Sequence, residues 1–234
     1  MAVKANHDIS SGLDTAFINS AINSNLAYRP EFVSNDYTQG KKVSVAIERE
    51  LRHCDAFYIS VAFITEGGLA PLKQVLAELR DKGIPGKILT TSYLTFTEPK
   101  ALKTLADLSN VEVRVYDSTD EGASGFHTKG YIFKEEEIYR FIVGSSNMTA
   151  SAFSVNKEWN TKLVSTSDGE LLKQMMTEFN ALWNSKHTLA VKDFIEDYEV
   201  RYRLIKEQKK NAAKEQMVDL QAYKLQPNKM QARF

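Results

Sequence analysis

The chain has 234 residues, 43% of them hydrophobic, and its 30 basic side chains balance 30 acidic ones to a formal net charge of +0. At about 100–200 residues per domain, this length fits one large domain, or one domain with an appendage, that can bury a core without disulfides. The single cysteine, Cys54, excludes a disulfide framework and any site of several cysteines, while the charge balance argues against indiscriminate binding to polyanions.

The first 40 residues predict a helix followed by an irregular arm. Apolar residues recur at helical spacing as far as Ile22, and Pro30 then interrupts the pattern. An apolar stripe at helical spacing predicts a helix over 41–54 that ends in a buried, inert Cys54. The apolar run 57–63 is rich in strand-forming residues and predicts a buried strand.

The same alternation of helix and strand repeats downstream. A helical face of leucines over 69–79 ends before Gly83, and 87–91 is the next strand. Thr97 is expected to cap a helix with Pro99 in its first turn, and that helix leads to a strand over 111–115. Strands that alternate with helices of 10–15 residues predict an α/β fold.

The second half of the chain continues with strands and longer helices. Ser167 and Glu170 have the spacing of a capping box at the start of a long helix. Met175 and Met176 on that helix are expected to pack in or beside the core. The other elements predicted here are paired strands at 125–133 and 138–143, a strand at 158–164, a helix at 191–205, and a charged linker or exposed helix at 206–222.

Polar residues with chemical potential gather in the middle of the chain. His127 and Lys129 are two residues apart on a predicted strand, so both side chains would project from one face. An imidazole nucleophile beside a fixed cation suits attack on a phosphate ester. At a strand-to-helix junction, the stretch Gly144-Ser-Ser-Asn147 offers backbone N–H groups, hydroxyls and an amide for phosphoryl oxygens.

A third polar stretch follows, with Asn156, Glu158 and Asn160 on one face if the segment is extended. Each stretch alone has a plain structural explanation, because H-x-K occurs by chance, Gly-Ser-Ser-Asn is a common turn and a lone glutamate is usually a surface carboxylate. The three together, each at a strand or a strand end, form a specific pattern.

This pattern resembles the phospholipase D superfamily, whose motif runs H-x-K-x4-D-x6-G-S-x-x-N or close to it. The residues that fall on that motif are His127, Lys129, Gly144, Ser145 and Asn147. Lys134 stands where the motif has an aspartate. Metal-independent restriction nucleases of the superfamily show a similar departure and carry a glutamate downstream, which Glu158 matches in position. The resemblance implies a phospholipase D-like α/β fold, with a mixed, largely parallel sheet flanked by helices on both faces and a C-terminal helical extension.

A wider resemblance, over roughly residues 10–205, is to the amino-terminal nuclease-like domain of bacterial DEAD/DEAH-box, restriction-type helicases. The ending Leu225–Gln231 resembles the entry to their helicase core, yet no G-x-x-x-x-G-K-[ST] loop occurs, so we expect a fragment without ATPase activity. The segments that carry the wider resemblance are 54–63, 93–97, 112–116 and 156–160. The predicted divisions are an N-terminal helix and arm (1–40), a phospholipase D-like catalytic domain (41–186), a helical extension or linker (187–222) and the start of a truncated helicase domain (223–234).

The superfamily implies that one histidine attacks phosphorus and a second protonates the leaving group. Only His127 has a lysine partner, so we expect a twofold homodimer in which each chain supplies His127, Lys129 and Asn147 to a shared site. Glu158 would accept a hydrogen bond from the imidazole. The residues expected to bind the phosphate are Lys129, Ser145, Ser146 and Asn147.

DNA is the expected substrate, at a groove around Lys129. No metal and no cofactor is expected in this fragment, since ATP and magnesium would belong to the absent helicase. No apolar run has the length of a membrane span, so a cytoplasmic protein is expected. Trp159 and Trp183 are expected to pack rather than stack on bases, although Trp159 is placed beside Glu158 where it can line the groove. The candidate flanking DNA contacts are Arg140, Lys157, Trp159 and Lys162.

Two other functions stay open on the sequence. The first is a DNA-binding or dimerisation module that keeps the fold without cleavage. The second is hydrolysis of another phosphodiester, including a phospholipid, which the absence of basic clusters or an amphipathic membrane helix weakens. The set of His127, Lys129, Asn147 and Glu158 favours catalysis over a pure scaffold.

Overall fold

The computed structural model describes residues 2–222. The segment 223–234, which we predicted to begin a helicase domain, lies outside the described residues. The chain divides into two compact units between Ile195 and Glu196, and all candidate site residues belong to the first. The domain boundaries predicted after residues 40 and 186 stay predictions.

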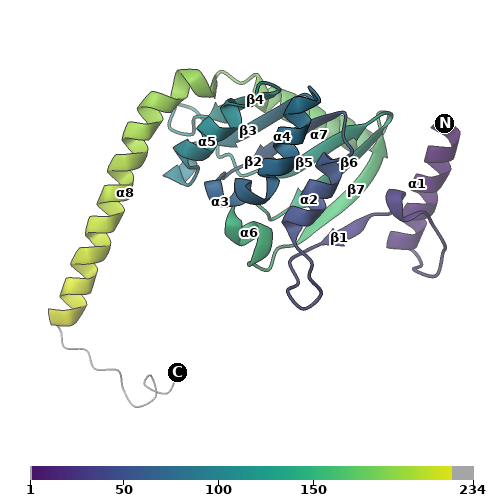
Figure 1. Ribbon diagram of the computed structural model, residues 1–234, viewed down its shortest axis with the longest axis horizontal. Coiled ribbons are helices and arrows are strands. Elements are labelled where there is room, and N and C mark those ends of the chain that lie inside the picture. Colours follow the sequence, from purple (N-terminus) through teal and green to yellow (C-terminus); the bar gives the residue numbers. More distant parts are fainter. Residues whose placement is uncertain (1, 223–234) are drawn as a thin grey trace, which may run out of the picture. The chain divides into compact units, whose positions relative to one another are not determined.

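One mixed sheet forms the centre of the first unit. Its strands are β1 (Glu31–Val33), β2 (Ala56–Val61), β3 (Gly86–Thr91), β4 (Val111–Tyr116), β5 (Lys129–Glu135), β6 (Ile138–Gly144), β7 (Asn160–Thr166) and β8 (Thr188–Ala190). Within residues 2–222 they lie in the order β1-β7-β6-β5-β2-β3-β4-β8 (Figure 1). Of the pairs between them, β2–β3 and β3–β4 are parallel and the other five are antiparallel.

The predicted mixed α/β fold is confirmed, but the sheet is not largely parallel. A tight turn between Glu135 and Ile138 makes β5 and β6 an antiparallel hairpin, and β1 and β8 add antiparallel strands at the two edges. The sequence predicted neither edge strand, because each has only three residues.

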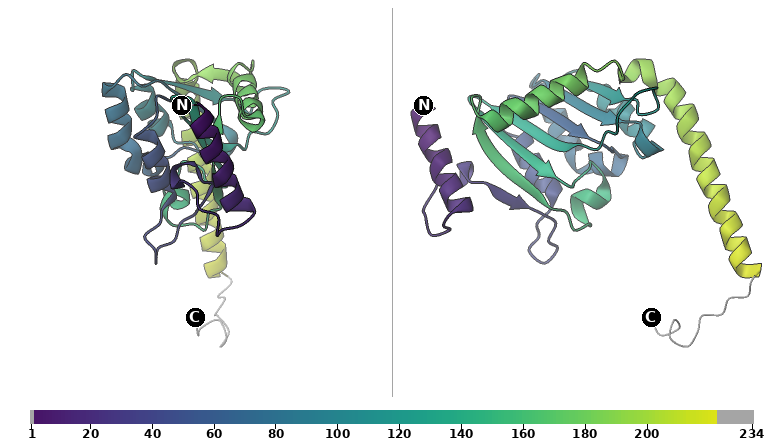
Figure 2. Two further views of the ribbon diagram at one scale, coloured as in Figure 1. Left: turned by 90° about the vertical axis from the view of Figure 1, so that its right-hand side faces the viewer. Right: turned by 180° about the vertical axis from the view of Figure 1, so that it is seen from behind.

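Helices cover both faces of the sheet, as predicted. The helices of the described chain are α1 (Ala2–Phe17), α2 (Val43–Leu51), α3 (Glu66–Leu69), α4 (Lys73–Asp81), α5 (Pro99–Ala106), α6 (Ala150–Ser154), α7 (Glu170–Trp183) and α8 (Val191–Ala222), with short 3₁₀ turns at Leu26–Tyr28, Ala70–Leu72 and Tyr93–Thr95. Helices α2 to α6 lie on one face of the sheet and α7 lies on the other (Figures 1 and 2).

The core on the α7 side anchors the segment that carries His127. Phe126 is 3% exposed and packs in one buried cluster with Tyr116 of β4 and with Phe179 and Trp183 of α7. Burying an aromatic side chain of this kind contributes roughly 1.5–3 kcal/mol. The residue before the histidine is therefore fixed to the core, while His127 itself is exposed.

Two predicted helix caps are wrong. Helix α7 begins at Glu170 with Gly169 as its N-cap, too late for Ser167 and Glu170 to form a capping box. Thr97 is fully buried, and its hydroxyl donates to the carbonyl of Thr91 at 3.0 Å instead of capping α5. In both cases the polar side chain lies one or two residues too far from the first helical turn.

The described residues offer neither a membrane-spanning helix nor a clustered metal site. Within residues 2–222 no helix combines the length and the apolar character that a membrane crossing needs. The same part of the chain holds no group of three or more His, Cys, Asp or Glu side chains arranged to bind a metal ion.

Candidate active site

His127 and Lys129 lie at the start of β5, where β2 and β5 stop pairing. Lys129 is the first residue of β5 and lies opposite Val61, the last residue of β2. His127 lies two residues outside the strand, so its predicted place on a strand is wrong. The reason is that β2 ends at Val61, which leaves the backbone at His127 without a partner strand.

The two side chains nevertheless meet. The Lys129 Nζ lies 2.9 Å from the His127 Nδ1 and 3.2 Å from its Nε2, and it donates to the His127 carbonyl oxygen at 3.0 Å. The His127 ring also lies edge-on to Phe63, with 6.2 Å between the ring centroids. Phe63 ends the apolar run after β2, and nothing in the sequence pointed to this contact.

Partial burial lowers the pKa of the Lys129 amine below its ordinary value, and the nearby carboxylate of Glu158 acts in the opposite direction. The same carboxylate contributes to the raised pKa of Tyr131, whose main cause is complete burial. Glu158 therefore acts electrostatically on Lys129, although the two residues are 29 positions apart in sequence.

Glu158 and Ser145 form a closed hydrogen-bonded unit. The Ser145 Oγ donates to the Glu158 Oε2 and accepts from the Trp159 N–H at 3.0 Å, while the Ser145 N–H donates to the Trp159 carbonyl at 3.1 Å. Glu158 is 8% exposed. We expected the imidazole of His127 to be its partner, but within the described chain the partner is Ser145, so Glu158 holds the turn rather than the ring.

The remaining residues of the Gly-Ser-Ser-Asn stretch take different roles. The Asn147 Oδ1 accepts from the Phe63 N–H at 3.1 Å, which fixes the amide beside the His127 contact and leaves its NH₂ group to donate elsewhere. Ser146 is fully buried, and its hydroxyl accepts from the Asn160 Nδ2 at 2.9 Å. The Ser146 hydroxyl, predicted to bind the phosphate, is therefore buried and hydrogen-bonded inside the fold.

Gly144 allows the close approach of this turn to β7. A Cβ at Gly144 would lie 2.2 Å from the Trp159 carbonyl oxygen and 2.6 Å from the Asn160 Cα. Both are backbone atoms that cannot rotate away. The glycine of the motif is therefore required by packing between β6 and the segment that carries Glu158.

Arg140 and Lys162, expected as flanking contacts, are held in ion pairs with acidic side chains of the fold. The Lys162 amine is 3.1 Å from Glu31 and 3.4 Å from Glu50, and its side chain is 4% exposed. Arg140 pairs with Glu135 and lies 3.8 Å from Glu50. Both cations are used inside the fold and are not available to a substrate. The sequence shows that Arg140 and Lys162 alternate with core residues along β6 and β7. It does not show their acidic partners, which lie far away in the chain.

Lys157 and Trp159 are exposed beside Glu158, as the sequence allowed. Trp159 is 75% exposed and therefore does not pack in the core, whereas Trp183 is 3% exposed and stacks on Phe179. Cys54 is buried, and burial raises the pKa of its thiol to about 12, as expected for an inert cysteine. Met175 and Met176 are partly buried against the core.

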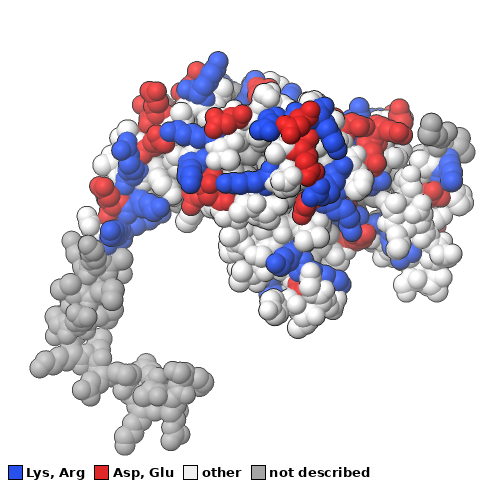
Figure 3. Space-filling view, viewed as in Figure 1, with Lys and Arg blue, Asp and Glu red and all other residues white. Residues whose placement is uncertain are grey.

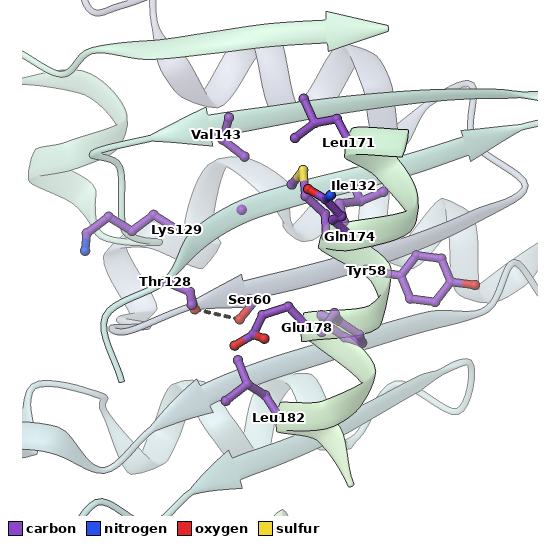
Figure 4. A pocket seen from close by; sticks show the side chains of 13 residues that line it. Tyr58, Ser60, Thr128, Lys129, Ile132, Val143, Leu171, Gln174, Glu178 and Leu182 are labelled. Atoms are coloured by element: carbon purple, nitrogen blue, oxygen red, sulfur yellow. Dashed lines mark hydrogen bonds between the residues drawn. The ribbon is translucent and has the colours of Figure 1, made fainter. Parts of the chain in front are cut away.

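A groove of about 420 Å³ opens between α7 and strands β2, β5 and β6 (Figure 4). Its walls are mainly apolar, with Ile132 and Val143 from the sheet and Leu171 from α7. Figure 4 shows Lys129 at one end with its amine directed away from α7, and the Ser60–Thr128 hydrogen bond, 2.6 Å long, on its floor. The groove thus leads to the cation of the candidate site.

Comparison with known proteins identifies a family for the central part of the chain. Residues 53–183 match the family described as "Cardiolipin synthase, PLD-like domain". No curated protein sequence is significantly similar to the chain.

Three solved structures illustrate the likeness in fold. Nuc, a phospholipase D family member from Salmonella typhimurium, has a TM-score of 0.52 at 17% identity over 69% of this chain and 98% of Nuc. NucT from Helicobacter pylori has a TM-score of 0.52 at 14% identity, with the same coverage. Phosphatidylserine synthase from Haemophilus influenzae Rd KW20 has a TM-score of 0.52 at 15% identity over 81% of this chain and 46% of the synthase. Because the family match spans more than half of the 234 residues, the chain belongs to the PLD-like domain family.

Proposed function

We propose that this protein is a metal-independent phosphodiester hydrolase that cleaves DNA with His127 as the nucleophile. The observation that carries the proposal is the contact between the Lys129 amine and both ring nitrogens of an exposed histidine. Such a pair presents a nucleophile and a cation to the same phosphate. The Asn147 amide, held by Phe63, is the neutral donor beside them.

The reaction proceeds in two displacements. A ring nitrogen of His127 attacks phosphorus, the bond from phosphorus to the leaving sugar oxygen breaks, and that oxygen takes a proton. Water then attacks the phosphohistidine, gives up a proton to the group that acted as the acid, and releases the phosphate end with His127 restored. Lys129 neutralises the charge that develops on the non-bridging oxygens in both steps.

The acid in the first step is His127 of a second copy of the chain. Of the three other histidines, His187 is buried and its Nδ1 lies 3.2 Å from Asp120, and His53 is on the surface with its Nδ1 2.8 Å from the Arg49 carbonyl. His7 is exposed on α1, with its Nδ1 3.8 Å from Asp8. None of the three is recorded in contact with His127 among the described residues. A twofold homodimer supplies the missing imidazole, since each chain gives one His127 to the shared site.

We propose DNA as the substrate, and a restriction or defence helicase as the full protein, because parts of the chain resemble the amino-terminal domain of such helicases. The segments that carry this resemblance are 54–63, 93–97, 112–116 and 156–160. Glu158 contributes by holding Ser145 and by its charge on Lys129.

The proposal is tested with His127→Ala and a matched control, His53→Ala, on bis(p-nitrophenyl) phosphate and on plasmid DNA, each with and without excess chelator. His127→Ala is expected to lose at least about 10³-fold in kcat/KM, as nucleophile deletions do, while both proteins keep their circular dichroism spectra. The control and the chelated wild type should keep full activity. A chelator-sensitive activity, or an active species that sediments as a monomer, would refute the proposal.

A second candidate function is a DNA-binding or dimerisation module without turnover. The observation that favours it is that the Ser145 hydroxyl, expected on the phosphate, is already bonded to Glu158. Salt-dependent binding to DNA with no hydrolysis of the dye substrate would select this function.

A further inference from the structure

Two large aromatic side chains lie exposed next to the candidate site. Trp159 is 75% exposed and Phe32 of β1 is 63% exposed, and their rings meet edge to face with 5.8 Å between centroids. Scattered exposed hydrophobic residues are ordinary, but a paired tryptophan and phenylalanine form a contiguous apolar surface that usually has a binding role. This pair of rings is called the aromatic pair below.

The backbone ties the aromatic pair to the site. Both the N–H and the carbonyl of Trp159 bond to Ser145, and Glu158 precedes it directly. Phe32 is held by strand pairing, opposite Thr161 of β7. The rings therefore keep a fixed position relative to Glu158 and Ser145.

Lysines from a neighbouring loop border the same surface. Residues 34–42 connect β1 to α2, and Figure 3 shows basic side chains gathered on this loop. A groove of about 450 Å³ is lined by Phe32 together with Lys41 and Lys42. Both lysines are exposed, whereas Glu31, which lines the same groove, is paired with Arg49 and Lys162. Phe32 therefore borders a groove that offers two exposed cations.

One buried asparagine fixes this loop beside the Glu158 segment. The Asn35 Nδ2 donates to the carbonyls of Ala152 and Asn156 at 2.8 and 2.9 Å, and its Oδ1 accepts from the Val43 N–H at 2.9 Å. Lys157 lies near the loop as well. The pKa of Asp36 is lowered mainly by the Thr38 hydroxyl, and the charge of Lys157 contributes.

We propose that the aromatic pair, with Lys41, Lys42 and Lys157, binds single-stranded nucleic acid, with an unpaired base stacked on Trp159. Aromatic faces beside basic groups are the combination that holds a single strand, because every base can stack and every nucleotide carries a phosphate. A duplex hides its bases and would gain only the phosphate contacts. All three lysines are exposed and form no ion pair among the described residues, and only Lys157 has a recorded electrostatic effect on a nearby carboxylate, that of Asp36. This inference rests on the proposed function, since it names the strand that would reach His127.

The first test measures binding in a His127→Ala background, where the strand is not cleaved. Labelled dT₂₀ and a hairpin duplex of equal charge are titrated with the variants Trp159→Ala and Trp159→Phe. The matched control is Phe17→Ala, because Phe17 is an aromatic residue on α1 that is 67% exposed. Loss of one stacked base predicts about 5- to 150-fold weaker binding of dT₂₀ by Trp159→Ala. Duplex affinity should change less than twofold, Trp159→Phe should recover part of the loss, and the control should bind as the parent does.

The second test uses intrinsic fluorescence. The chain has two tryptophans, so Trp183→Phe leaves Trp159 as the only indole emitter. Stacking predicts quenching of this emission by dT₂₀ and not by the duplex. In the parent background, the double change of Lys41→Gln and Lys42→Gln should reduce the slope of log K against log salt for dT₂₀ by about 1.4, or about 0.7 per phosphate contact.

The outcomes separate this proposal from the function on which it rests. Failure of the proposed hydrolase appears as absent turnover of bis(p-nitrophenyl) phosphate by the wild type, whereas binding of dT₂₀ by the His127→Ala protein is independent of turnover. Three results would each overturn this inference. The first is an equal loss of affinity for single strand and duplex, and the second is Trp159 emission that dT₂₀ does not quench. The third is a Trp159→Ala protein that keeps its affinity for dT₂₀ but dissociates from dimer to monomer. The last result would make the aromatic pair a contact between copies of the chain.

Discussion

Replacing Lys162 by methionine tests whether this cation belongs to the fold or to a DNA surface. Lys162→Met keeps most of the side-chain volume but removes the charge that lies 3.1 Å from Glu31 and 3.4 Å from Glu50. The Glu50 side chain is 7% exposed, so its carboxylate would lose a partner in a buried setting. Removing one member of a buried ion pair costs about 3–5 kcal/mol.

The lower end of that range applies here, because Glu50 keeps two arginines. Arg49 lies 3.4 Å and Arg140 3.8 Å from its carboxylate, and Glu31 is about one-third exposed to water. We therefore expect the free energy of unfolding to fall by about 3 kcal/mol. For a unit of nearly 200 residues, this corresponds to a melting temperature about 6–12 °C lower.

The assay is urea unfolding followed by circular dichroism, with Lys157→Met as the matched control. Lys157 is exposed and forms no ion pair within the described chain, so its replacement should change stability by less than about 0.5 kcal/mol. DNA affinity, measured below the unfolding transition, should be unchanged in Lys162→Met. The reasoning is refuted if that variant keeps wild-type stability within 1 kcal/mol or if its folded form binds DNA more weakly than the wild type.

Three further predictions concern the site itself. Gly144→Ala places a Cβ 2.2 Å from a backbone oxygen and should lower the free energy of unfolding in urea by about 1–3 kcal/mol. The control, Gly125→Ala, has open space around it and should leave that free energy unchanged. Equal stabilities of the two variants would contradict the packing role of Gly144. Because the pKa of Lys129 is lowered, its positive charge is lost at a lower pH than that of an ordinary lysine. The alkaline limb of the kcat/KM profile should therefore lie at a correspondingly lower pH. Glu158→Gln removes the opposing effect of the carboxylate and should move this limb further down, and a limb that stays in place would show that Glu158 does not act through Lys129.

Much of the fold could be predicted because its signals are local. The apolar stripe over 41–54 corresponds to α2 at Val43–Leu51, and the apolar run at 57–63 corresponds to β2 at Ala56–Val61. Periodicity identifies such elements without knowledge of their neighbours. The edge strands were missed because β1 is defined only by its pairing with β7, more than a hundred residues downstream.

The site was predictable to the extent that its residues act in short motifs. His127 and Lys129 meet although the histidine is outside the strand, since a two-residue spacing keeps side chains near each other in several backbone conformations. The partner of Glu158 could not be foreseen, because Ser145 reaches it through the close packing of β6 and β7 at Gly144. Motif spacing therefore identifies which residues gather, but the packing of the strands decides which of them bond.

The charge balance of the chain illustrates the same limit. Thirty positive and thirty negative side chains suggested no broad affinity for polyanions, yet the net charge does not say which cations are neutralised inside the fold. Arg49, Arg140 and Lys162 are compensated by acidic groups on the α2 face of the sheet. Lys41, Lys42 and Lys157 form no ion pair within the described residues, and Lys41 and Lys42 line the groove beside Phe32. Since charges separated by more than about 8 Å are screened at physiological ionic strength, a phosphate in this groove would experience the local lysines rather than the net charge of the chain.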